Sequence, residues 1–437
     1  MFQPSLIILI LFGFAQSLRA ELPDIPQPKS IEKKRSKSVP SLVIEDEAVT
    51  KEQRKNVGTD LENFSTEVVN RIDKVVSRKG FNLLGEPWTV QGIPLLFPTS
   101  SNGFHIGLHA KMYNIARQDP HKIEITGQVL SSDKGRDKHF ISVDIPHVFD
   151  EQYRLTARLA YNRDISFHYY GIGNDTTIDP TKEGGDYYDN TRSGPAIQIS
   201  LLRYLGNSYR MGPIFGSKWT EISVPKNSKL EADRPDGITG GKTNYLGFAI
   251  VRDTLDFEPY PTKGTFNELY VYWFSPWLGS TYNYQRYTFT SRFYVPLHPK
   301  LILAHRTLIE VLGGDAPFYE VGMVGGSDST LGLGGDRFVR GYEGNRYIDK
   351  YRFFMGWELR WDPYKIIFAG QEFILGVVPF IDFGRVWETL DRFYQGKIHA
   401  SMGYGLRILW NKTFVVRADW AMNDERKAVF IELGNSF

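Results

Sequence analysis

The sequence predicts an all-β protein, a transmembrane antiparallel β-barrel of sixteen strands that follows a short N-terminal periplasmic tether and one amphipathic helix. After residue 20 there is no run of about eighteen apolar residues, so a membrane-spanning helix is not available. Several later segments alternate apolar and polar residues, which is the period of a strand with two unlike faces. Phe, Trp and Tyr make up 14% of the chain, an excess typical of barrels with aromatic girdles. These observations favour strands as the membrane-crossing elements.

Residues 1–20 have the features of a secretory signal peptide. They contain an apolar stretch from Leu6 to Phe14 and a small residue, Ala20, at a suitable cleavage site, although no Lys or Arg precedes the apolar stretch. The chain contains no cysteine and therefore no lipoprotein acylation site. A secreted chain with a barrel domain is expected in the outer membrane of a Gram-negative cell.

Residues 21–87 are predicted to form a periplasmic segment before the barrel. Residues 21–45 are rich in Pro, Ser, Lys and Glu, a composition typical of a disordered tether. Apolar residues from Val57 to Val75 then recur at spacings of three and four, which predicts one amphipathic helix over residues 50–78. This helix either packs against a neighbouring part of the chain or docks a separate periplasmic partner.

The barrel is predicted to span residues 88–437. Its clearest strand, residues 397–410, places seven apolar side chains on one face, as a strand that crosses the hydrocarbon layer must. A half-buried strand of a soluble sheet rarely continues this pattern for so long. The sixteen predicted strands cover residues 90–98, 103–116, 121–132, 137–148, 152–163, 194–206, 209–223, 242–252, 264–275, 282–296, 299–311, 352–362, 373–387, 397–410, 412–422 and 427–437.

The connections between these strands divide into two groups. Tight turns, such as residues 205–208 and 410–412, fall on one side of the sheet, whereas the long segments 164–193, 224–241 and 312–351 fall on the other. Short periplasmic turns and long external loops are the asymmetry expected of an outer-membrane barrel. A miscounted strand would have mixed the two groups, so the division supports the count of sixteen.

The first predicted strand contains two prolines, Pro94 and Pro98. Proline cannot donate a hydrogen bond to a neighbouring strand, so it belongs on the edge of a sheet. In a closed barrel the first and last strands must meet, and these prolines would leave that seam with fewer hydrogen bonds. Alternatively, residues 90–98 form a periplasmic lead-in and the true first strand begins later.

Four short motifs occur in a fixed order along the predicted barrel. They are YYGIGN at residues 169–174, a turn containing Asp253, Pro261 and Gly264, VRGY at Val339–Tyr342, and FIDFG at Phe380–Gly384. The chain resembles the outer-membrane protein assembly family of BamA and TamA, also called bacterial surface antigens, to which two-partner secretion transporters are related. The first motif resembles a strand end of the family and the second its periplasmic turn. The last two are the more specific, because they resemble the tip of the family's long inward loop and the strand that receives it.

The resemblance implies a loop held inside the barrel by an ion pair. Residue parity places Glu358 and Asp382 on the inner face, and the resemblance implies that Arg340 contacts Asp382 and Glu358. The planar guanidinium suits this role because it can bind two carboxylates at once. The expected members of this loop latch are Arg340, Gly341, Tyr342, Glu358, Asp382 and Gly384. Inward glycines are expected to leave room for the loop backbone, namely Gly376, Gly384, Gly403 and Gly405. In the alternative interpretation Arg340 is one of many lumen charges.

The last ten residues carry a further expected feature. Alternation places Val429, Ile431, Leu433 and Phe437 on one face of the last predicted strand. In the family that the chain resembles, and in outer-membrane proteins generally, such a segment is the signal that the insertion machinery reads. The chain is therefore expected to be a client of the barrel-assembly machinery, in contact with outer-membrane lipid and lipopolysaccharide.

The resemblance leaves the function open among three hypotheses. Family insertases carry periplasmic modules of about seventy-five residues before the barrel, and residues 21–87 are too short for one beside the tether. The chain is either a barrel that inserts or translocates proteins by opening its seam, a passive pore or structural protein that kept the fold, or a translocator that depends on a partner docked on helix 50–78. The missing modules favour the pore, whereas the prolines and Arg340 favour the translocator.

Enzymatic activity, a cofactor and a nucleic-acid partner are not expected. Ser, His and Asp residues occur without a nucleophile motif, and the glycine-rich residues 325–335 lack the lysine of a phosphate-binding loop. His105 and His109 lie two residues apart on one face of a predicted strand, a spacing that permits metal binding. They are interpreted as ordinary polar residues of the lumen, and no metal site is predicted.

Overall fold

The computed structural model describes residues 79–99, 103–114, 116, 121–183, 185–327, 330–368, 371–410 and 414–437. The predicted signal peptide, the tether and the helix over residues 50–78 lie outside the described residues. No helix in the described part of the chain is long and apolar enough to cross a membrane.

Seventeen strands of the described residues form a single sheet. Each strand pairs antiparallel with the next along the chain, and β12 pairs with β15 across the longest connection. The strands of this sheet are β1 (Lys79–Leu83), β2 (Glu86–Thr99), β3 (Gly103–Asn114), β4 (Ile123–Ser132), β5 (Asp137–Val148), β6 (Tyr153–Asp164), β7 (Thr191–Leu205), β8 (Tyr209–Ser223), β9 (Gly241–Asp253), β10 (Gly264–Phe274), β11 (Tyr284–His298), β12 (Leu301–Gly314), β15 (Tyr351–Phe368), β16 (Gln371–Trp387), β17 (His399–Trp410), β18 (Phe414–Met422) and β19 (Lys427–Leu433).

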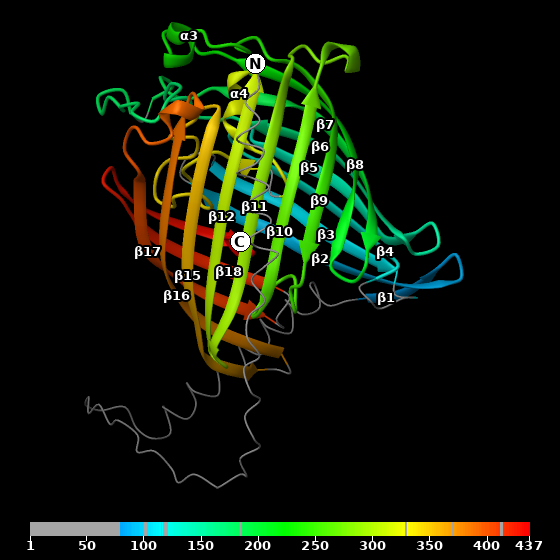
Figure 1. The fold of residues 1–437 in the computed structure, drawn as a ribbon. Coiled ribbons are helices and arrows are strands. Elements are labelled where there is room, and N and C mark those ends of the chain that lie inside the picture. Colours follow the sequence, from blue (N-terminus) through cyan, green and yellow to red (C-terminus); the bar gives the residue numbers. More distant parts are fainter. Residues whose placement is uncertain are drawn as a thin grey trace, which may run out of the picture. The chain divides into compact units, whose positions relative to one another are not determined.

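Short elements occupy the connections. In the part of the chain that the structure describes, these are two α-helices, two 3-10 helices and a small second sheet, namely α3 (Lys229–Asp233), η1 (Pro276–Leu278), α4 (Phe318–Val321), β13 (Met323–Val324), β14 (Thr330–Leu331) and η2 (Leu390–Arg392). In Figure 1 the large sheet curls into a barrel, which confirms the predicted fold class.

The sixteen predicted strands correspond to β2–β12 and β15–β19. Residues 90–98 belong to β2, so the alternative interpretation of a lead-in is wrong. β1 was not predicted, and its residues had been assigned to the periplasmic segment. It pairs with β2 through a two-residue turn at Leu84 and Gly85, where both residues have positive φ angles of 54° and 79°. Such a turn favours Asn or Gly at both positions, so Leu84 gives little signal in the sequence.

Alternation along the strands gives the barrel an apolar outer face. Leu108, Leu159, Leu406 and Ile431 point outward and are 51%, 53%, 57% and 73% exposed. Inward-facing neighbours include charged residues such as Glu358, which is 1% exposed. The apolar surface therefore faces the lipid and the buried polar groups lie in the interior, as expected of a transmembrane barrel.

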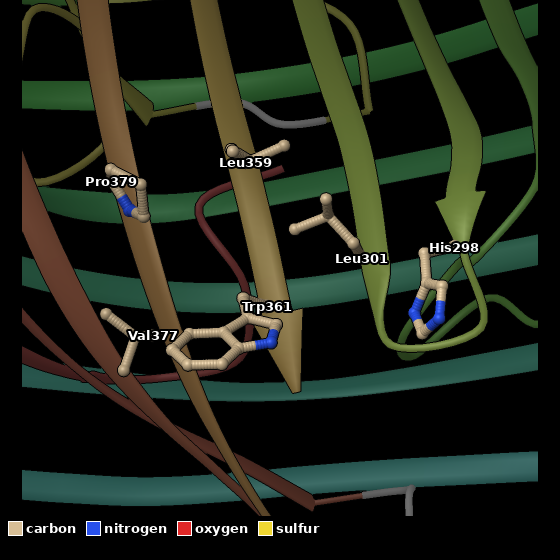
Figure 2. Close-up of a pocket in the computed structure, with 6 residues that line it drawn as sticks. All are labelled: His298, Leu301, Leu359, Trp361, Val377 and Pro379. Carbon is tan, nitrogen blue, oxygen red and sulfur yellow. The ribbon is translucent and has the colours of Figure 1, made fainter. Parts of the chain in front are cut away.

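The outer face also carries a shallow apolar recess between the ends of neighbouring strands (Figure 2). The β15–β16 register shifts between Trp361 and Tyr364, beside this recess. It is lined by His298, Leu301, Leu359, Trp361, Val377 and Pro379. Its apolar lining suits lipid chains better than a polar ligand.

The three longest connections lie at one end of the strands, as predicted from their order, together with the short β4–β5 turn at residues 133–136. We call the end with the connections 165–190, 224–240 and 315–350 the loop end. The other end, with turns such as 206–208 and 299–300, is called the turn end. This division follows from the antiparallel pairing of consecutive strands.

The longest fully described turn-end connection joins β9 to β10 and contains the predicted turn motif. Asp253 accepts a hydrogen bond from the Leu255 backbone amide at 3.1 Å and forms an ion pair with Arg210 at 3.2 Å. Pro261 is buried beside Tyr260. Gly264 has a φ of 104°, and an added Cβ would lie 2.2 Å from the Thr254 carbonyl oxygen. Only glycine fits where the chain re-enters the sheet.

We expect Gly264→Ala to lower the free energy of unfolding by about 1–3 kcal/mol, because the new methyl group adds a clash to a strained backbone conformation. Urea titration of the purified barrel in detergent, followed by the shift between folded and unfolded mobility on gels, measures this change. Gly185→Ala is the matched control, since Gly185 has no positive φ and nothing within 4 Å of an added Cβ. Equal stability of the two variants would contradict the prediction.

Candidate functional site

The connection between β12 and β15, residues 315–350, folds into the barrel, and we call it the inward loop. Its tip is part of the protein core, because Phe338, Val339 and Tyr342 are at most 1% exposed. These side chains pack in one cluster with wall residues of β12, β15 and β16, among them Leu308, Phe354 and Val386. The loop appears in Figure 1 as the yellow segments within the barrel.

Arg340, at the tip of the inward loop, binds three carboxylates of the barrel wall. Its Nε and Nη2 donate to the two oxygens of Asp382 at 2.8 and 2.9 Å. Its Nη1 donates to Glu358 at 2.7 Å and, at 3.4 Å, to Asp419. The Arg340 backbone amide also donates to Asp382, at 3.1 Å. The contacts expected from the resemblance are present, and Asp419 adds one that was not expected.

The wall supplies these carboxylates from three strands. Glu358 lies on β15, Asp382 on β16 and Asp419 on β18, each pointing inward by strand parity. Further arginines bind the same carboxylates: Arg360 lies 3.0 Å from Glu358, and Arg417 lies 2.9 Å from Asp419. Because all five side chains are at most 1% exposed, each charge depends on its partners for stabilisation.

Two glycines allow the loop tip to approach the wall. Gly341 has a φ of 104°, which suits glycine, and an added Cβ would lie 3.2 Å from the Ala421 side chain. At Gly384, on β16, an added Cβ would lie 2.6 Å from the Val339 side chain of the loop.

The prediction that the other inward glycines make room for the loop backbone is wrong. Their nearest neighbours are groups of the barrel wall itself. An added Cβ would lie 2.5 Å from Asp362 at Gly376, 2.0 Å from the Trp420 carbonyl at Gly403, and 2.1 Å from Asp419 at Gly405.

A second anchor holds the first part of the inward loop to the opposite part of the sheet. Glu320, in α4, is 2% exposed and forms ion pairs with Arg286 at 3.1 Å and Lys218 at 3.3 Å. Burial by itself would raise the pKa of Glu320, but Lys218, Arg286 and Arg192 outweigh it and hold the pKa below its usual value. The loop therefore spans the interior between two charged attachment points, Glu320 and Arg340.

The inward loop also binds the connection between β18 and β19. The Tyr342 hydroxyl donates to Asp424, and the Tyr347 hydroxyl donates to Glu425 at 2.9 Å. Arg346 forms an ion pair with Glu425 at 2.6 Å. The last hairpin of the sheet is thus attached to the loop that Arg340 holds.

The YYGIGN motif does not end a strand, since β6 ends at Asp164. It crosses the loop end and joins separate connections. The Gly173 amide donates to the Ile348 carbonyl at 2.9 Å. Asn174 accepts from the Val386 amide at 3.0 Å and donates to the Lys397 carbonyl at 2.9 Å. The motif therefore helps to hold the inward loop beneath it.

The C-terminal residues do not share one face. Val429 and Ile431 point outward at 65% and 73% exposure, but β19 ends at Leu433 and Phe437 is buried. The prediction that Phe437 continues the outward face is wrong. Arg360 donates to the Phe437 carbonyl oxygen at 2.9 Å, and Ser436 donates to Glu358. Polar contacts inside the barrel therefore end the alternation.

Neither predicted lumen histidine takes part in this site. His105 is buried and stacks on Phe97, and His109 shares a 3.2 Å hydrogen bond with Gln128. Within the described ranges, no group of three or more His, Cys, Asp or Glu residues is placed to hold a metal ion.

Several residues of the site were not predicted from the sequence. Strand alternation already places Asp419 on the inner face, where Arg340 was expected. The sequence therefore contained a signal for this contact. Glu320 and Asn174 lie in irregular segments, where periodicity gives no direction for a side chain. Their roles follow from the way in which distant loops meet.

Arg340→Ala is expected to leave the barrel folded but to weaken the attachment of the inward loop by about 3–5 kcal/mol, because Asp382 and Glu358 would remain buried without their partner. The measurement is the rate of limited proteolysis within residues 315–350, together with the unfolding midpoint in urea. Arg337→Ala, in the same loop with a side chain 33% exposed, is the matched control. If both variants are cleaved as slowly as the unmodified protein, the latch does not hold the loop.

The barrel was compared with known protein sequences and solved structures. No curated protein sequence is a detectable relative. Among solved structures, BamA from Haemophilus ducreyi lacking POTRA domains 1–3 is similar with a TM-score of 0.52 and 12% identity, over 86% of this chain and 77% of that one. CdiB from Escherichia coli is similar with a TM-score of 0.51 and 11% identity, over 83% of this chain and 68% of that one.

These structural similarities concern the fold, in which a barrel of the same kind recurs at low sequence identity. The sequence provides the family, since the Omp85 superfamily domain matches residues 130–437. The matched region contains the inward loop, Arg340 and the three carboxylates that bind it. The chain belongs to the Omp85 superfamily of outer-membrane β-barrel proteins.

Proposed function

We propose that this barrel inserts proteins into the outer membrane or translocates them across it, by opening between β2 and β19. The main support is that only part of the β2 edge can form backbone hydrogen bonds with β19. Residues Glu86–Val90 pair with β1 on one side and Trp88–Val90 pair with β3 on the other, so β1 occupies the edge that faces away from β3. The remaining stretch, Gln91–Thr99, contains two prolines.

The other side of the proposed opening is also short. β19 contains seven residues, compared with fourteen in β2. Each backbone hydrogen bond contributes about 0.5–1.5 kcal/mol, so a seam with few bonds costs less to open than a pair of long strands. Strand addition at an exposed edge is a general route by which a sheet binds an extended polypeptide.

The inward loop is placed to control this opening. Its residues Tyr342, Arg346 and Tyr347 bind the β18–β19 connection through Asp424 and Glu425. Movement of the loop would therefore act directly on the hairpin beside the seam. We propose that Arg340 keeps that hairpin closed between rounds of transport.

Relations with other components follow from this proposal. The loop end would face the exterior and contact lipopolysaccharide, while the apolar outer face would contact lipid chains. Val429 and Ile431 would form part of the signal by which the barrel-assembly machinery inserts this chain as a client. Docking of a periplasmic partner on residues 50–78 remains a prediction.

A passive pore is the second candidate function. It is favoured by the inner wall of β3–β6, which carries solvent-exposed polar side chains such as Arg158 and Lys138. The two functions differ in whether the seam must open, because a pore conducts ions while the seam stays closed.

Cross-linking the seam tests the first function. The chain has no cysteine, so pairs of cysteines introduced in Gln91–Thr99 and in β19 can be scanned for disulfide formation. A seam-locked variant is expected to lose acceleration of client-barrel folding into liposomes, and reduction is expected to restore it.

The matched control is a cysteine pair at Leu159 and Ile197, which are outward-facing register partners on β6 and β7 and lie several strands away from the seam. This cross-link should leave the acceleration unchanged. Two outcomes would contradict the proposal, namely liposomes that fold clients no faster with the protein than without it, and a locked seam that remains fully active.

A further inference from the structure

The inner wall of β3–β6 is uncovered, in contrast to the wall that binds the inward loop. Outward residues fix the parity of these strands, since Leu108, Val129, Ile141 and Leu159 are all at least 50% exposed on the apolar face. The residues between them point inward, and many of these retain solvent exposure. The attachments of the inward loop lie on other strands, from β8 through β18.

Cationic side chains outnumber carboxylates on this wall. The inward Lys, Arg, Asp and Glu side chains of β3–β6 are four cations and three carboxylates, namely Lys111, Lys138, Arg154, Arg158, Glu124, Asp144 and Asp164. Each carboxylate already has a cation: Glu124 lies 3.2 Å from Lys111, Asp144 accepts from Arg154 at 2.7 Å through both of its oxygens, and Asp164 lies 3.9 Å from Arg136. Arg158 and Lys138 have no carboxylate partner on these four strands.

Arg158 and Lys138 both point inward and are exposed. Arg158, on β6, stacks over the Phe140 ring at 3.7 Å, and among the described residues no carboxylate lies within ion-pair distance of it. Its register partner on β5 is Ser142, and on β7 it is Gln198, both of which are neutral. The guanidinium is therefore held in place by an aromatic face and keeps its charge available to solutes.

Lys138 lies farther toward the loop end, opposite the tip of the inward loop. Its side chain interacts electrostatically with Asp336 and Arg337 of that loop and with Glu432 of β19. Asp336 is itself bound by Arg417, through both its carboxylate and its backbone oxygen. The loop tip and the β5 wall thus face each other within the barrel, with Lys138 nearer the loop end and Arg158 deeper inside.

We propose that a passage past Arg158 and Lys138 runs through the barrel and conducts small anions in preference to cations. A surplus of cations on a confined wall raises the local concentration of anions and excludes cations, whereas matched ion pairs on the same wall contribute little. This activity is separate from client insertion, because it requires the resting barrel with its inward loop in place.

The test is the reversal potential of the full-length protein in a planar bilayer across a KCl gradient. The unmodified protein is expected to prefer chloride over potassium. The double variant Arg158→Gln and Lys138→Gln is expected to lose that preference, and Arg158→Glu is expected to favour potassium. Lys242→Gln is the control, because Lys242 stacks against the outward-facing Trp219 and its removal should leave the preference unchanged.

The proposal would be overturned by no conductance in the unmodified protein, by a preference for potassium, or by an unchanged preference in the double variant. Heat-dependent gel mobility and urea midpoints of each variant establish that the barrel is folded. Since client folding is measured separately in liposomes, the failure of one proposal leaves the other standing. Loss of chloride preference in Lys242→Gln as well would assign the selectivity to overall charge and would also refute it.

Discussion

The contact between the Arg340 guanidinium and the carboxylates of β15, β16 and β18 is the interaction on which the rest of the interior depends. Three carboxylates pointing into a barrel would repel one another and lose their hydration. Arg340 binds all three with directed hydrogen bonds, of which the shortest is 2.7 Å, and Arg360, Arg407 and Arg417 complete their neutralisation. Its place on a loop means that the barrel wall reaches its stable charge distribution only when the loop has folded inward. Loop and wall are therefore interdependent parts of one core.

This dependence extends to both ends of the barrel through shared side chains. Glu358 accepts hydrogen bonds from Arg340, Arg360 and Ser436, and so connects the inward loop to the last residues of the chain. At the loop end, Asp424 and Glu425 connect the same loop to the β18–β19 hairpin. A displacement of the loop tip would therefore reach the β18–β19 hairpin through direct contacts, as the proposed lateral opening requires.

Strand periodicity and turn chemistry allowed sixteen strands, their inward faces and the two ends of the barrel to be predicted from the sequence. Arg340, Glu358 and Asp382 followed from the family resemblance together with parity. Structural features outside the regularly alternating strands could not be predicted in this way. The β1 hairpin turns at Leu84, a residue with little preference for positive φ, and Phe437 leaves its strand to meet Arg360. Glu320 lies in a helix of four residues, whose direction depends on contacts remote in sequence.

The short β1 hairpin has a consequence for the biogenesis of the protein. Before a barrel closes, its first strand presents an open row of backbone donors and acceptors, which is a template for aggregation with other chains. Here the chain covers Glu86–Val90 of that row with its own preceding residues, through a hairpin between strands adjacent in sequence. Pro94 and Pro98 interrupt the remainder. Before the barrel closes, this edge therefore offers other chains a shorter row of backbone groups than an uncovered strand of the same length would.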